Sequence, residues 1–148
     1  MRFFFYGTLL AGSDNPVAKF IHEKLRAVGP ARATGVLHAV PDPDGWYPAL
    51  LPGDGVAKGM LYEATESFTD ADLARLDAYE DYDPEQPQAS LYIREALDVV
   101  GPDGAGVAEA YRFARPLPEG SRPIADGDFR GWLAGAGVRA FAGRRSDS

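Results

Sequence analysis

The feature that most constrains the fold is the aromatic segment Phe3–Tyr6, which is followed at once by Gly7-Thr8-Leu9. This pattern predicts a buried strand over residues 2–6 that ends in a glycine turn. Backbone N–H groups at such a strand end can bind a carboxylate or a developing oxyanion, and Gly7 lets another group come close. The alternative, and the commoner use of the pattern, is a core strand with an ordinary turn.

The length and composition are those of one soluble domain. The 148 residues are 45% hydrophobic and 25% charged, which is enough for one substantial core. We expect a single domain over residues 1–141 and a frayed tail over 142–148. The formal charge of −7 argues against a nucleic-acid partner. No stretch has the length of a signal-peptide core or a membrane span, so we expect no membrane partner and a cytoplasmic location.

Turn residues divide the chain into short segments. Helices are predicted over residues 16–28, capped by Asn15 and ended by Gly29-Pro30, then from Thr69 onward, and near residues 128–133. Further strands are predicted over 31–40, 47–51, 56–63, 92–100 and 107–113, with a turn at 53–55 and a hairpin loop at 101–106. The resulting prediction is an α+β fold, a small mixed β-barrel of five to six strands with two or three short flanking helices.

The sequence contains no pattern of residues that is typical of a metal site or a nucleotide cofactor site. The chain has no cysteine, which excludes disulfides, thiolate catalysis and cysteine-ligated metals. Neither His22 nor His38 has ligand spacing to the acidic residues near position 80. The glycines at 101–106 lack the spacing and the following helix of a dinucleotide fingerprint. We therefore expect no metal and no cofactor.

The helix that opens at Thr69 leads to a candidate catalytic carboxylate. Glu80 lies one turn after Leu76, which marks the buried side of that helix, and tyrosines flank it. Partial desolvation there would raise the pKa of the carboxyl toward neutrality, which suits a general acid/base. The alternative is a solvated acidic loop formed by Glu80, Asp81 and Asp83.

Several short motifs occur along the chain in a recognisable order. They are Phe5–Leu9, Tyr47–Leu50, residues 56–62, Leu76–Glu80, Tyr92–Arg94 and Ala110-Tyr111. Together they resemble the γ-glutamylcyclotransferase-like family, which includes the γ-glutamylamine cyclotransferases and the plant AIG2-like proteins. The resemblance spans residues 3–113, and the order and spacing make it more specific than any single motif.

This resemblance implies a barrel whose cavity binds a small-molecule γ-glutamyl substrate. By similarity, Tyr6, Gly7, Thr8 and Leu9 would bind the α-carboxylate and amine end, mainly through backbone N–H groups, and Tyr92 would line the pocket. Glu80 matches the catalytic glutamate of the family.

The chain departs from the family pattern at one position beside the site. The family usually has glycine after the glutamate, whereas Asp81 follows Glu80 here. A second negative charge at this point could raise the pKa of Glu80 or repel the substrate carboxylate.

The implied reaction releases 5-oxoproline and a free amine from a γ-glutamyl amide. The α-amine of the substrate attacks its own γ-carbonyl carbon, with Glu80 as general acid/base, so no enzyme nucleophile is needed. Two alternatives stay open: a non-catalytic protein of the same fold that binds a γ-glutamyl or amino-acid ligand, and an amidohydrolase in which Glu80 activates water. The motifs do not specify the leaving amine or the oligomeric state.

Overall fold

The elements alternate between short helices and strands of very different lengths in a computed structural model that describes residues 1–7 and 16–141. In chain order they are β1 (Arg2–Phe5), α1 (Pro16–His22), β2 (Leu25–Asp42), β3 (Gly45–Ala64), α2 (Asp70–Tyr79), η1 (Pro87–Ala89), β4 (Tyr92–Gly101), β5 (Gly104–Phe113), β6 (Arg122–Pro123) and α3 (Phe129–Ala136). Asn15, the predicted N-cap of the first helix, lies outside the described residues.

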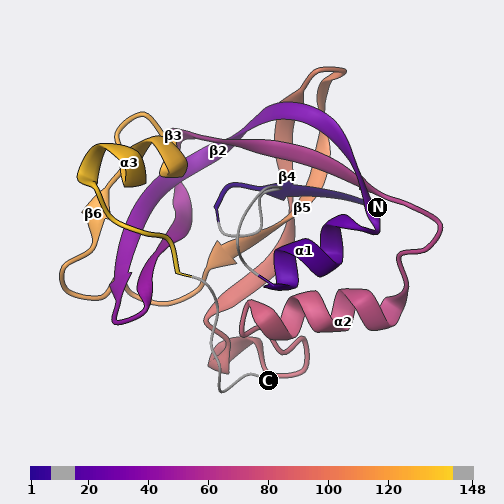
Figure 1. The fold of residues 1–148 in the computed structure, drawn as a ribbon, viewed down its shortest axis with the longest axis horizontal. Coiled ribbons are helices and arrows are strands. Elements are labelled where there is room, and N and C mark those ends of the chain that lie inside the picture. The colour runs from indigo at the N-terminus through magenta and orange to yellow at the C-terminus, as the bar shows by residue number, and fades with distance from the viewer. Residues whose placement is uncertain (8–15, 142–148) are drawn as a thin grey trace.

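Five strands pair into a closed ring (Figure 1). Strand β1 lies between β3 and β5, and the sheet continues through β4 to β2, which pairs back with β3. The β1–β5 pair is parallel and the other pairs are antiparallel, while the short β6 joins β2. Six strands and three α-helices among the described residues confirm the predicted α+β class, and the sheet is ring-like as expected.

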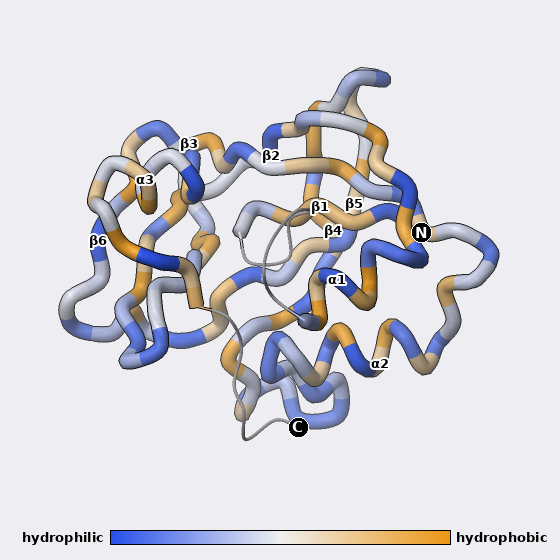
Figure 2. The backbone as a smooth tube through the Cα atoms, in the orientation of Figure 1, coloured by the Kyte–Doolittle hydropathy of each residue, from blue (hydrophilic) through white to orange (hydrophobic). Residues whose placement is uncertain are grey.

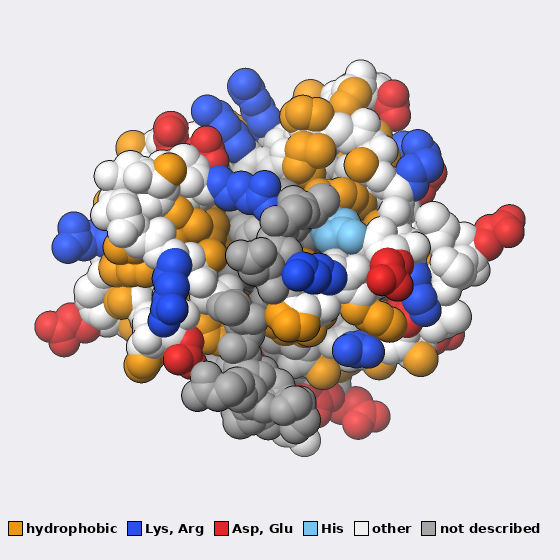
Figure 3. All heavy atoms as spheres, in the orientation of Figure 1, with side chains coloured by type: hydrophobic (Ala, Val, Ile, Leu, Met, Phe, Trp, Pro, Cys, Tyr) orange, Lys and Arg blue, Asp and Glu red, His pale blue; other side chains and the backbone are white. Residues whose placement is uncertain are grey.

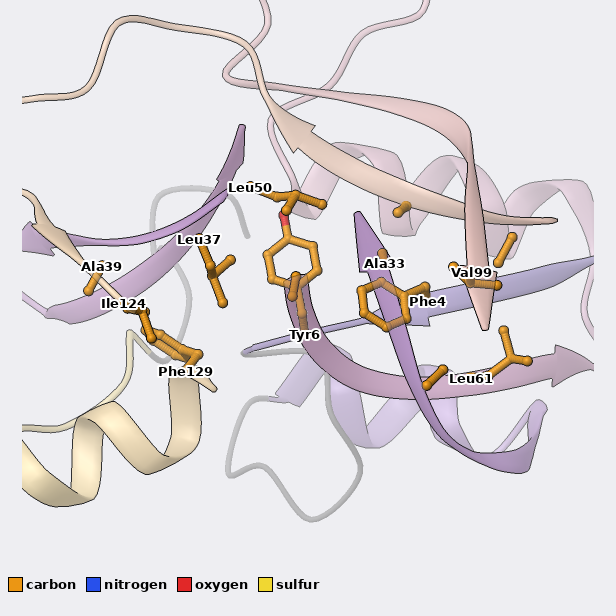
Figure 4. Close-up of a cluster of buried hydrophobic side chains, with 14 residues drawn as sticks. Phe4, Tyr6, Ala33, Leu37, Ala39, Leu50, Leu61, Val99, Ile124 and Phe129 are labelled. Carbon is orange, nitrogen blue, oxygen red and sulfur yellow. The ribbon is translucent and has the colours of Figure 1, made fainter. Parts of the chain in front are cut away.

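Strand β1 is buried on both faces from Phe3 to Phe5, which explains why these three residues are apolar. Phe4 and the following Tyr6 belong to a cluster that draws on all five strands and therefore lies inside the ring (Figure 4). Phe3 and Phe5 point to the opposite face, where they pack with residues of α1 and α2, as the period of two in a strand requires. Many inner positions are alanines, which fit the small interior; they are Ala31, Ala33, Ala39, Ala57, Ala108 and Ala110.

The first helix is shorter than the sequence pattern predicts. Helix α1 ends at His22, and residues 25–28 belong to β2 instead. Leu25 pairs with Ala64 at the far end of β3, so strand pairing overrides the apolar period of the segment. Gly29 does not end a helix; it lies at a register shift of β2 with a φ of 148°, and its hydrogen faces Pro102.

The predicted strands over 47–51 and 56–63 are one continuous strand. The turn expected at 53–55 is wrong, because β3 runs from Gly45 to Ala64 without reversing. Its partner β2 shifts register between Thr34 and Val36, which pair with Val56 and Leu51. The glycines therefore bend a long hairpin rather than close a short one.

Helix α2 is fixed at both ends, which positions the residue that follows it. At its start the Thr69 side chain accepts from the N–H of Asp72 at 3.2 Å, and the Asp72 carboxylate accepts from the N–H of Thr69 at 2.8 Å. This confirms the predicted capping box. At its end the N–H groups of Asp81 and Tyr82 donate to the carbonyls of Ala78 and Asp77. That pattern is a Schellman motif with Glu80 at the C-cap.

The third helix follows the sequence prediction closely. Asp128 caps α3 by accepting from the N–H of Gly131 at 3.0 Å, and the helix ends at Gly137 in the left-handed conformation. Trp132 packs against Trp46, with ring centroids 5.0 Å apart. The predicted hairpin loop at 101–106 is tighter than expected, since Gly101 already pairs with Gly104.

The polar and apolar positions are distributed as expected for a folded domain. Figure 2 shows both kinds alternating along α1 and α2, and the face in Figure 3 has acidic, basic and hydrophobic side chains interspersed. In the part of the chain that is described, no helix combines the length and the apolar character needed to cross a membrane.

The left-handed backbone at Asp81 gives a first prediction. Its φ of 54° favours glycine, and a β-branched residue would pay a steric penalty there. We expect Asp81→Val to lower the free energy of unfolding by about 1–2 kcal/mol. Asp81→Gly should stay within about 1 kcal/mol of the wild type, because relief of strain opposes the greater entropy of the unfolded chain. Urea unfolding measures both, and equal stability of the two variants would contradict the assignment.

Candidate active site

A single pocket collects most of the residues that the sequence analysis selected. Its walls come from β1, β3, β4, β5 and the end of α2, segments that are far apart in the chain. The lining residues are Phe4, Phe5, Tyr6, Gly7, Tyr47, Pro48, Tyr79, Glu80, Asp81, Leu91, Tyr92, Tyr111 and Phe141. Tyr6, Gly7, Glu80 and Tyr92 therefore share one pocket, while Thr8 and Leu9 lie outside the described residues.

Glu80 is half-buried at the end of α2 and faces this pocket. Its position follows from the Schellman motif, which turns the chain away immediately after the residue. Burial raises the pKa of the Glu80 carboxyl to about 8, and the negative charge of Asp77 adds to the rise. A carboxyl with this pKa can both accept and donate a proton near neutral pH.

Asp81 does not appear among the causes of the raised Glu80 pKa, one of the two effects considered in the sequence analysis. The charge that raises the pKa of Glu80 after burial is that of Asp77, one turn earlier, and not that of Asp81. Asp81 is exposed at the mouth of the pocket and occupies the left-handed C′ position of the helix end. The left-handed conformation favours glycine, the residue that usually follows the glutamate in the resembling family. Aspartate is among the few other residues that tolerate this conformation.

Gly7 is required by close packing at the end of β1. A Cβ atom at this position would lie 2.2 Å from Cγ of Pro48, so any other residue would displace β3. The carbonyl oxygen of Pro48 in turn accepts a hydrogen bond of 2.5 Å from the Tyr92 hydroxyl. The glycine thus brings β1, β3 and β4 together at one side of the pocket.

Three buried tyrosines surround Glu80, and each donates its hydroxyl proton to the protein. Tyr6 donates to the carbonyl oxygen of Tyr111, and its ring reaches toward Leu50 (Figure 4). Tyr92 donates to Pro48, and Tyr111 donates to Asp77 at 2.6 Å. Burial raises the pKa of all three phenols. They are therefore neutral at physiological pH, whereas the raised pKa of the Glu80 carboxyl lies close to it.

A partly buried ionic network behind the pocket was not selected as part of the site from the sequence. Asp77 accepts hydrogen bonds from Arg94 and Tyr111, and Arg94 also binds Glu109. These residues occur in or beside the family-like motifs, but their partners are 15 to 34 positions away in the chain. Only a register prediction that placed Arg94 opposite Tyr111 could have found the network.

Tyr62, His22 and His38 are not among the residues that line the pocket. Tyr62 and His22 pack against each other beside Phe5, with a centroid distance of 4.6 Å between the two rings. His38 lies in β2, and its buried Nδ1 has no hydrogen-bond partner among the described residues. Within residues 1–7 and 16–141, no group of three or more potential ligand side chains is arranged to hold a metal ion.

Comparison with known structures identifies the same fold in distant organisms. An AIG2-like protein from Mus musculus has a TM-score of 0.60 and 29% identity, with 80% of each chain covered. An uncharacterized protein from Pyrococcus horikoshii has a TM-score of 0.62 and 17% identity, covering 93% of this chain and 96% of the other. The ytfP protein of Escherichia coli has a TM-score of 0.56 and 25% identity, covering 87% and 96%.

The sequence itself matches a family model over almost its whole length. No curated protein sequence matches the chain. The model described as γ-glutamyl cyclotransferase, AIG2-like, matches residues 3–131, which include β1, α2, the pocket wall from β4 and β5, and Glu80. The chain belongs to the γ-glutamyl cyclotransferase, AIG2-like family.

Proposed function

We propose that this protein is a γ-glutamyl cyclotransferase that converts a γ-glutamyl amide into 5-oxoproline and a free amine. The observation that carries the proposal is the Glu80 carboxyl, which faces the pocket with a pKa raised to about 8. Family membership supports a cyclotransferase-type activity in general. The identity of the general acid/base and the bond that breaks are part of the proposal.

The proposed reaction forms and breaks one bond to the same carbon. The α-nitrogen of the substrate forms a bond to the γ-carbonyl carbon, and the bond from that carbon to the amide nitrogen breaks. Glu80 takes a proton from the α-ammonium group and gives it to the leaving nitrogen, and the second proton that the attacking nitrogen loses on becoming the ring amide also passes to the released amine. The α-ammonium group is mostly protonated at neutral pH, so a base is needed, and Glu80, with its pKa raised to about 8, is suited to accept the proton.

Substrate placement is expected to come from the strand end beside Glu80. Gly7 and the two residues after it, Thr8 and Leu9, would bind the α-carboxylate through backbone N–H groups. Tyr6 and Tyr92 would form the walls, since both line the pocket and are held by hydrogen bonds to the backbone. A substrate held in the folded-back conformation can gain on the order of 7 kcal/mol from intramolecular attack.

Replacement of the proposed base gives the direct test. We expect Glu80→Gln to reduce the rate of 5-oxoproline formation by roughly 10²-fold or more, because the amide cannot accept the proton. The measurement is 5-oxoproline release from a panel of γ-glutamyl amines, γ-glutamyl amino acids and glutathione. Glu85→Gln is the matched control, since Glu85 is an exposed carboxylate on the loop that follows, and it should keep the wild-type rate.

The panel also separates the alternative activities. Release of glutamate in place of 5-oxoproline would identify an amidohydrolase. Ligand binding without either product would identify a binding protein. A Glu80→Gln variant that still cyclises substrate at the normal rate would refute the assignment of the base.

The raised pKa of Glu80 predicts a specific pH dependence. The carboxylate form, which accepts the proton, becomes populated as the pH rises through about 8, so kcat/KM should rise along a limb with that midpoint. At still higher pH the α-ammonium group of the substrate also loses its proton, so that none remains for Glu80 to give to the leaving nitrogen, and kcat/KM should fall. We therefore expect an optimum at a pH above about 8, measured by initial rates of 5-oxoproline release. A rising limb near the ordinary glutamate pKa would contradict the burial of Glu80.

A further inference from the structure

The C-terminal turn of α2 is held against the sheet by a partly buried ion pair. Arg94 on β4 donates from Nε to Oδ1 of Asp77 at 2.9 Å and from Nη2 to Oδ2 at 3.4 Å. The Tyr111 hydroxyl, from β5, donates to the same Oδ1 at 2.6 Å. Arg94 and Tyr111 are directly opposite each other in the β4–β5 ladder, so two neighbouring strands reach one carboxylate.

The charges of this network do not cancel. Arg94 also donates from Nη1 to Glu109 at 2.5 Å, so one guanidinium is shared between two carboxylates. The side chains of Asp77, Arg94 and Glu109 are 7%, 17% and 23% exposed, so water screens them weakly. With the carboxylates ionised, the network has a net charge of −1, and Asp77 is its most buried member.

Glu80 is the titratable group that faces this charge across the last turn of the helix. Asp77 and Glu80 are three residues apart, a spacing that places side chains on neighbouring parts of a helix surface. The groups around the same pocket are Tyr6 and Tyr47 from the β1 and β3 side, Tyr92 from β4, Tyr111 from β5, and Tyr79 and Asp81 from the end of α2. The positive charge of Arg112 opposes the rise in the pKa of Tyr6. The guanidinium of Arg94 forms ion pairs with the two carboxylates of the network.

We propose that Asp77 and Arg94 act as positioning residues for Glu80. Asp77 presents a fixed negative charge, which favours the protonated form of the Glu80 carboxyl over the carboxylate. Arg94 and Glu109 set the size of that charge, since the guanidinium only partly neutralises Asp77. The inference rests on the proposed function of Glu80, but it concerns how that residue is prepared for proton transfer. Tyr111 orients the Asp77 carboxylate by its hydrogen bond.

A purely structural role is the alternative for this ion pair. Buried ion pairs have a large desolvation penalty, and apolar replacements are often equally stable. A structural role predicts that removal of either partner weakens the fold. A positioning role predicts in addition that the two removals shift the titration of Glu80 in opposite directions, because one deletes the negative charge and the other deletes its compensation.

The experiment is a titration of the Glu80 carboxyl by NMR in protein labelled with ¹³C in the glutamate side chains. The Glu80 resonance is assigned by its loss in Glu80→Gln. Asp77→Asn should lower the titration midpoint by on the order of one pH unit, because the opposing charge is gone. Glu109→Gln, which leaves Asp77 in place and brings the network to neutrality, should lower it in the same direction by less.

Variants of Arg94 test the expected shift of the Glu80 midpoint to higher pH. In Arg94→Gln the last proton of the Asp77–Glu80 pair should leave at a higher pH than in the wild type, since two carboxylates then face each other without compensation. Arg94→Lys keeps the positive charge and should restore most of the wild-type midpoint. If Asp77→Asn does not fold, Glu109→Gln still tests the expected downward shift of the Glu80 midpoint, and the two Arg94 variants still test the upward shift.

Opposite shifts support the proposal, whereas unchanged midpoints, or shifts of the same sign in the aspartate and arginine variants, overturn it. In the active variants the rising limb of kcat/KM should move with the NMR midpoint. The NMR titration needs no substrate, so it tests the network even if no γ-glutamyl compound is turned over. Absence of 5-oxoproline from the wild type would refute the proposed function, and absence of opposite shifts would refute the positioning role.

Discussion

The burial of β1 on both faces is the constraint on which the rest of the structure depends. Its pairings with β3 and β5 close the ring. Its alternate side chains fill the interior on one side and pack with the helices on the other. Because the strand ends at the pocket, the residue that follows it, Tyr6, belongs to the core and to the pocket wall at the same time.

Local signals in the sequence were sufficient for the elements that depend on neighbouring residues. The capping box at Thr69, the short helix near residues 128–133 and the buried strand at Phe3–Phe5 are all present in the structure. The placement of Glu80 on the inner side of α2 also follows from helical periodicity, because Leu76 is buried one turn before it. The α+β class could be predicted from the number and order of such elements.

Long-range pairing decided the features that the sequence did not predict. Residues 25–28 have an apolar period compatible with a helix, but they lie opposite the end of β3 and form strand. The glycines at 53 and 55 resemble a turn, but they bend a strand whose partner is fixed by pairing on both sides. The Asp77–Arg94 contact joins a helix to a strand across 17 positions, and only the β4–β5 register brings its members together.

The pocket combines hydrogen-bonded phenols with a carboxyl of raised pKa, Glu80, and this carboxyl has a thermodynamic consequence for folding. The ordinary pKa of a glutamate is 4.5, whereas that of Glu80 in the folded state is about 8. Between these values the folded chain retains a proton that the unfolded chain releases, so this residue makes folding less favourable as the pH rises. Partial exposure of Glu80 to the pocket reduces the effect below its limit of about 1.4 kcal/mol per pH unit. The stabilising contribution of the Glu80 proton is therefore lost progressively between about pH 4.5 and 8, before the proposed base is largely ionised.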